Sequence, residues 1–207
     1  MKLAKCWKKL LQDLGFDPNL DSNQETFEAL IQAYSEPHRY YHTLVHIEAM
    51  LHHFDNASSL AQYPEEVALA IWFHDAIYDP HSASNELDSA EWAARFMCAN
   101  SATSDFIARV HQLIMATLHD SDIESPDGKL LVDIDLSILG ASAHVYDEFE
   151  SNVRKEYAWV PESLFKEKRK AILQSFEQRN PLYQTEYFRD KLEAQAKTNL
   201  ARTIALL

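Results

Sequence analysis

Apolar residues recur three or four positions apart over most of the chain, a spacing that predicts amphipathic helices. The first predicted helix runs from Leu3 to Leu14 and ends at Gly15. Further helices, bounded by capping residues, proline or glycine, are predicted at about 21–34, 42–54, 65–77, 86–99, 106–118, 142–159, 161–178 and 188–204. Pro126-Asp127-Gly128 predicts a turn in the loop 120–129. We therefore expect an all-α protein.

One apolar run carries two polar residues in its middle. Residues 68–78 read Ala-Leu-Ala-Ile-Trp-Phe-His-Asp-Ala-Ile-Tyr, so His74 and Asp75 fall inside the predicted helix 65–77. A buried ionised carboxylate costs several kcal/mol unless it is paired or binds a metal. The run therefore predicts a partner for Asp75, and a metal ion shared with His74 is the first candidate.

A second apolar run also carries carboxylates. Residues 130–140 contain Asp133 and Asp135, which cannot both be buried without partners. Asp135 lies between Ile134 and Leu136, and it is the better candidate for an inward-facing ligand.

Several histidines precede or follow these runs. His42 and His46 are four residues apart, so on a helix they share one face, a common metal-binding arrangement that also occurs by chance. His52 and His53 are interpreted as surface residues. His119 stands at a predicted helix end, where an imidazolium interacts favourably with the helix dipole, so it has a structural alternative to a site role.

Composition narrows the class of protein. The chain has 207 residues with 3 Gly and 7 Pro, which favours a single helical domain over 1–207. We expect a metal-site core at about 39–140, with the helices of 142–207 packing on it. The formal net charge of −13 argues against binding to nucleic acid polymers or anionic membranes. No apolar stretch reaches 18 residues, which argues against a membrane span.

Cysteine content and the first residues predict a cytoplasmic protein. Cys6 and Cys98 form no disulfide framework, and reduced thiols are the simpler interpretation. The N-terminus lacks the apolar segment of a signal peptide.

Positive charge is concentrated between Arg154 and Arg169. Arg154, Lys168 and Arg169 are candidates for binding the equatorial oxygens of a phosphoryl group. Their structural alternative is a set of ordinary solvated helix charges.

The order of the candidates along the chain resembles the HD superfamily of metal-dependent phosphohydrolases. Tyr41–His46 and Asp135–Ser137 also look like motifs of the cyclic-nucleotide phosphodiesterases, a distant branch of that superfamily. A closer resemblance is to the predicted HD phosphohydrolases of bacteria. It is carried by Tyr41-His42…His46, Trp72-Phe-His-Asp-Ala-Ile-Tyr78, Asn85-Glu86…Ser89-Ala90, Thr117…His119, Asp133-Ile-Asp-Leu136, Arg154…Glu156-Tyr157 and Asn199-Leu200.

The resemblance implies a buried metal site in a helical bundle of HD type. It implies His46, His74, Asp75 and Asp135 as metal ligands, and His42 as the acid that protonates the leaving oxygen. Two-metal members carry a further histidine where this chain has Tyr78, which favours one divalent ion: iron, zinc, nickel, manganese or magnesium.

The remaining candidates have assisting roles. Glu86 is a candidate for assisting the attacking water, or alternatively for capping its own helix. His119 is a second candidate acid. Tyr78 and Asn85 are candidates for contacting substrate.

These residues predict a metal-dependent phosphohydrolase. Bound metal lowers the pKa of water and supplies a hydroxide for attack on phosphorus. The expected partners are a small phosphorylated substrate, such as a nucleotide, and a second copy of the chain in a homodimer. Two alternatives remain open: an iron-dependent oxygenase of the same superfamily, and a non-catalytic nucleotide or metal sensor.

Overall fold

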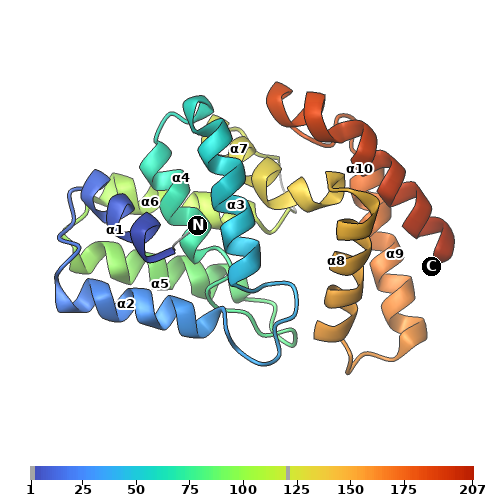
Figure 1. Cartoon of the computed structure of the whole chain (residues 1–207), viewed down its shortest axis with the longest axis horizontal. Helices are drawn as coiled ribbons and strands as arrows, with labels where there is room; N and C mark the ends of the chain where they lie inside the picture. Colours follow the sequence, from blue (N-terminus) through green and yellow to red (C-terminus); the bar gives the residue numbers. More distant parts are fainter. Residues whose placement is uncertain (1–2, 120–121) are drawn as a thin grey trace. The chain divides into compact units, whose positions relative to one another are not determined.

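The computed structural model of the chain describes residues 3–119 and 122–207, and its elements within these ranges are all helices, joined by turns and loops (Figure 1). The described residues form ten α-helices, two short 3-10 helices and no β-strand, which confirms the all-α prediction. None of these helices combines the length and apolar character needed to cross a bilayer. The helices are α1 (Leu3–Asp13), α2 (Asp21–Ala33), α3 (Leu44–Ala57), η1 (Ser58–Leu60), α4 (Pro64–Phe73), α5 (Asn85–Ala99), α6 (Ser104–Ala116), α7 (Pro126–Asp135), η2 (Leu136–Gly140), α8 (Ala143–Glu156), α9 (Glu162–Gln178) and α10 (Glu186–Leu206).

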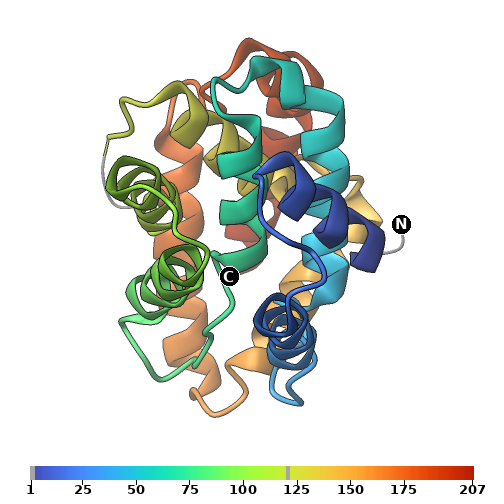
Figure 2. The same cartoon turned by 90° about the vertical axis from the view of Figure 1, so that its left-hand side faces the viewer.

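The chain divides into two compact units between Val132 and Asp133. In the first unit α4 is the central helix, since it packs against α1, α3, α5 and α6 (Figures 1 and 2). Every residue of α4 from Leu69 to Phe73 is buried. A helix that is apolar on all sides needs neighbours on all sides, which explains its central position.

Aromatic rings fix the end of α4 in the core of this unit. The ring of Trp7 on α1 lies 5.3 Å from that of Trp72 and 5.4 Å from that of Phe96 on α5, measured between centroids. The ring of Phe73 lies 5.5 Å from that of Phe96. Such pairs contribute about 0.5–1.5 kcal/mol each beyond their buried area. The residues that follow Phe73 are therefore attached to a helix end that is packed in the core.

The predicted helix 65–77 is wrong at its C-terminal end. Helix α4 ends at Phe73, so His74 and Asp75 lie in the turn that follows it. The apolar run continues beyond the helix because Ala76 and Tyr78 are buried in irregular structure. Helical periodicity alone does not distinguish these two situations.

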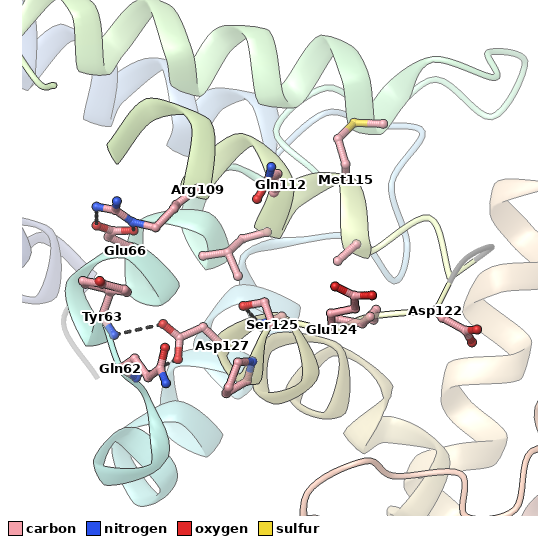
Figure 3. A pocket seen from close by; sticks show the side chains of 15 residues that line it. Gln62, Tyr63, Glu66, Arg109, Gln112, Met115, Asp122, Glu124, Ser125 and Asp127 are labelled. Atoms are coloured by element: carbon pink, nitrogen blue, oxygen red, sulfur yellow. Dashed lines mark hydrogen bonds and ion pairs between the residues drawn. The ribbon is translucent and has the colours of Figure 1, made fainter. Parts of the chain in front are cut away.

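The predicted turn at 126–128 is also wrong, because Pro126 begins α7. Proline suits the first position of a helix, where its missing N–H has no intrahelical partner. Asp127 is buried, and its carboxylate accepts hydrogen bonds from the backbone N–H groups of Gln62 (2.7 Å) and Tyr63 (2.9 Å), just before α4 (Figure 3). It therefore ties the start of α7 to the start of α4.

In the second unit, α10 packs against α9 and η2, and α8 also packs against η2. Asn199 on α10 donates hydrogen bonds to the carbonyl oxygens of Leu139 and Ala141, both at 2.9 Å. Gly140 lies so close to α10 that an added Cβ would stand 2.6 Å from Cβ of Leu192. The glycine therefore permits the close approach of η2 and α10.

Candidate metal centre

Three of the predicted ligands converge in the first unit. His46 comes from α3, and His74 and Asp75 come from the turn after α4. The Nε2 atoms of the two histidines are 3.2 Å apart, and Oδ2 of Asp75 lies 3.0 Å from Nε2 of His74 and 3.8 Å from Nε2 of His46. Both histidines are buried and Asp75 is half-buried.

These separations suit a coordination sphere. Donor atoms about 2.1 Å from one ion, at angles of about 90–130°, lie about 3.0–3.8 Å from one another. The three ligand atoms cover this range, and all lie within 4.8 Å of one another. His46, His74 and Asp75 could therefore hold a metal ion.

The hydrogen bonding of His74 favours the same use. Its Nδ1 lies 3.0 Å from the carbonyl oxygen of Ile71, which can only accept, so Nδ1 carries the proton. In the neutral ring Nε2 then presents its lone pair toward His46 and Asp75. A backbone carbonyl that fixes the tautomer of a histidine is typical of metal ligands.

His42 lies beside this group but outside it. Helix α3 begins at Leu44, so His42 precedes the helix, and the predicted placement of His42 and His46 on one helix is wrong. Nε2 of His42 is 4.0 Å from Oδ2 of Asp75, and its ring is 4.2 Å from that of Tyr78. Its side chain is 21% exposed, against 4% for His46. His42 thus lies on the more solvent-accessible side of the three ligands.

Glu86 and His119 are the two predicted assisting residues of the first unit. Burial raises the pKa of the Glu86 carboxyl, its own backbone N–H lowers it, and the nearby charge of Asp75 raises it. His119 has a φ of 58°, a left-handed conformation in which histidine is enriched among non-glycine residues. The charge of Asp75 thus acts on the Glu86 carboxyl, whereas an assisting role of His119 stays a prediction.

The fourth predicted ligand belongs to the second unit. Asp135 is the last residue of α7 and is half-buried. Its neighbour Asp133 is fully buried and has a structural role: its carboxylate accepts from the backbone N–H groups of Gln184 (2.8 Å) and Thr185 (2.7 Å) and from the Thr185 hydroxyl (2.6 Å). The choice of Asp135 over Asp133 as a ligand stays a prediction, supported by these three bonds.

The two substrate-contact candidates of the first unit have internal partners. The side-chain amide of Asn85 accepts from the backbone N–H of Asp79 and donates to the Asp79 carbonyl, both at 3.0 Å. These bonds favour a structural role for Asn85. The buried ring of Tyr78 faces His42, and its backbone carbonyl accepts a hydrogen bond from His38 at 2.8 Å.

The cationic candidates of the second unit differ in exposure. Arg154 donates to the carbonyl oxygens of Tyr157 and Val160, which holds the turn between α8 and α9. Arg169 forms a two-bond ion pair with Glu150, at 2.7 and 3.0 Å. These contacts favour the structural alternative for both arginines, whereas Lys168 is exposed.

A cavity of about 620 Å³ lies in another part of the first unit (Figure 3). It is lined by residues of α6, of the loop between α6 and α7, and of the first turns of α4 and α7 and the segments before them. None of the three converging ligands lines it. Its charged residues are partly paired within the wall, since Arg109 donates two hydrogen bonds to Glu66 at 2.6 and 2.8 Å. This cavity is therefore separate from the candidate metal centre.

Sequence reasoning missed the side chains that support the ligand-bearing turn, above all Arg39 and Ser89. Arg39 donates to the carbonyl oxygens of Asp75 and Ala76, and the Ser89 hydroxyl accepts from the backbone N–H of Ile77 at 3.0 Å. These residues lie within or beside the motifs, but nothing in their spacing indicates that they are buried against a turn.

Comparison of the chain with protein families, curated proteins and solved structures finds no match. The resemblance to the HD superfamily thus rests on the motifs themselves.

Proposed function

We propose that this protein is a metal-dependent phosphohydrolase that cleaves a phosphate ester of a small molecule, a nucleotide being one candidate. The convergence of His46, His74 and Asp75, with ligand atoms 3.0–3.8 Å apart, is the observation that carries the proposal. Two imidazoles and one carboxylate leave coordination positions open, as a catalytic site requires. Asp135, the fourth ligand that the resemblance implies, stays a prediction.

The side chains around these ligands supply the remaining chemistry. A divalent ion held here would lower the pKa of water toward neutrality and so supply a hydroxide for attack on phosphorus. His42, which lies toward solvent beside Asp75, would donate a proton to the leaving oxygen. Glu86, half-buried and within electrostatic reach of Asp75, would receive a proton from the attacking water.

A screen for phosphate release tests this proposal. Chelator-treated protein would be supplied with iron, zinc, nickel, manganese or magnesium and assayed on nucleotides and other phosphate esters. We expect phosphate release with at least one metal, its loss in Asp75→Asn, and its retention in His52→Ala, since His52 is an exposed histidine of α3.

The same screen tests the alternatives. Oxygen consumption by the iron-loaded protein without phosphate release would favour the oxygenase. Binding of metal and nucleotide without turnover on any ester would favour the sensor.

A further inference from the structure

Arg39 carries a buried positive charge next to the candidate metal centre. Its side chain is 0% exposed, and burial of an ionised group requires partners. Nε donates to a Glu36 carboxylate oxygen at 3.0 Å. Nη1 donates to the carbonyl oxygens of Asp75 at 2.7 Å and His42 at 3.2 Å, and Nη2 donates to that of Ala76 at 3.0 Å. Three of these four bonds thus go to backbone carbonyl groups.

Those carbonyl groups belong to the two segments that carry the site. One segment contains His42 and leads into α3 and His46. The other is the turn with His74 and Asp75. The planar guanidinium bonds both segments at once, which a fork of fixed geometry can do and a single ammonium cannot. Arg39 therefore ties together the two backbone segments that carry the three ligands.

Two tyrosine rings hold the guanidinium in this position. Its central carbon lies 5.1 Å from the ring centroid of Tyr34 and 5.4 Å from that of Tyr78. The Tyr34 hydroxyl donates to the carbonyl oxygen of Trp72 at 3.0 Å, on the last turn of α4. The Tyr78 ring in turn contacts His42.

The turn depends on such donors because helical hydrogen bonding ends before it. Carbonyl groups that lack helical partners and are shielded from water need other donors, and those of five successive residues accept from side chains. The donors are Arg39 for Asp75 and Ala76, Ser89 for Ile77, His38 for Tyr78, and Asn85 for Asp79. Of these side chains, Arg39 is the one whose bonds also reach the backbone of the segment preceding α3.

We propose that Arg39 is a positioning residue of the metal centre, which sets the separation between the His42–His46 segment and the His74–Asp75 turn. The inference rests on the metal centre of the proposed function. Outer residues that orient metal ligands typically contribute 10–100-fold to metal affinity. A merely structural arginine would change unfolding without changing the geometry of bound metal.

The test compares Arg39→Lys with a matched arginine variant, Arg109→Lys. Arg109 lies in the same unit, pairs with Glu66 and stacks 4.5 Å from the ring centroid of Tyr63, away from the ligands. Each chelator-treated protein would be titrated with Co²⁺, with affinity read by calorimetry and coordination by the visible d–d spectrum, and folding checked by circular dichroism. We expect Arg39→Lys to weaken binding by about 10–100-fold and to alter the spectrum, and Arg109→Lys to match wild type.

A second measurement needs no variant and keeps the inference testable if Arg39→Lys does not fold. In wild-type protein titrated with Zn²⁺, the Arg39 guanidinium N–H resonances should shift and exchange more slowly with water, whereas those of Arg109 should not change. If the chemical shifts and exchange rates of the Arg39 guanidinium protons do not change when zinc binds, the inference is overturned.

The outcomes separate this inference from the proposed function. Wild-type Co²⁺ affinity and spectrum in folded Arg39→Lys overturn the positioning role alone. Metal binding that depends on Arg39, without phosphate release from any ester, supports the positioning role and counts against the phosphohydrolase. Wild-type protein that binds neither Co²⁺ nor any of the five metals of the phosphate-release screen overturns both.

Discussion

Replacing Asp75 by asparagine removes the one carboxylate among the three converging ligands while keeping the side-chain volume. Its Oδ2 is 3.0 Å from Nε2 of His74 and 3.8 Å from Nε2 of His46, so a bound ion would have this oxygen in its coordination sphere. The amide offers a neutral oxygen in place of a charged one. Asp75→Asn should therefore lower metal affinity while leaving the metal-free fold intact.

The size of the effect follows from linkage between binding and folding. At a metal concentration 100-fold above its Kd, binding stabilises the native state by about 2.7 kcal/mol. Outer partners of metal ligands contribute 10–100-fold to affinity, so loss of a charged ligand should weaken binding by at least about 100-fold. At the same metal concentration the variant would retain about 0.4 kcal/mol. The difference of about 2.3 kcal/mol corresponds to about 5–9 °C in Tm for a chain of this length.

Thermal unfolding of wild type and variant, each with chelator and with metal, measures this difference. Asp79→Asn is the matched control, because Asp79 is an exposed carboxylate four residues away whose oxygen accepts from the backbone N–H of His81. The control should gain as much Tm from metal as wild type. An equal metal-dependent gain in Asp75→Asn would refute the assignment of Asp75 as a ligand.

Three further predictions separate the neighbouring roles. His46→Ala should lose the metal, whereas His42→Ala should retain it and hydrolyse substrate about 10²–10⁴-fold more slowly. Activated aryl phosphates, whose leaving groups need no proton, should restore the rate of His42→Ala. Elemental analysis that finds metal in His46→Ala and none in His42→Ala would exchange the two roles. Glu86→Gln should keep its metal and lose activity by a similar factor in single-turnover assays, and an empty site in this variant would make Glu86 part of the ligand set. Asp133→Ala should destabilise the protein by about 3 kcal/mol or more in urea unfolding with chelator present, because three donors lose a buried acceptor, whereas the exposed Asp190→Ala should not.

Local sequence signals were sufficient for most of the helices. Leu3–Asp13 ends before Gly15, whose φ of 74° is the left-handed conformation that favours glycine after a helix. The errors arose where tertiary contacts decided a boundary. The sequence Pro126-Asp-Gly128 is compatible with a turn and with the start of a helix. In the structure it starts α7, and the Asp127 carboxylate accepts hydrogen bonds from the segment before α4.

The sequence was sufficient to predict which residue types form the candidate site, but only part of how they are arranged in space. An imidazole and a carboxylate inside an apolar run predict a buried partner, and His46 does meet His74 and Asp75. The roles of Arg154 and Arg169 could not be predicted, because a sequence does not show that Glu150 and two carbonyl groups engage their guanidinium groups. Arg39 was missed for the same reason, since its burial is a property of the fold.

The close approach of His74 and Asp75 is easier to achieve because α4 stops before them. Inside an α-helix, adjacent side chains leave the axis about 100° apart, so their ends diverge. In the turn, by contrast, Nε2 of His74 and Oδ2 of Asp75 are 3.0 Å apart. The turn leaves carbonyl groups without helical partners, and Arg39 supplies donors to two of them. Substitutions of such donors should therefore change how metal is held without removing any ligand, so residues beyond the histidine and aspartate motif help to determine the chemistry of this centre.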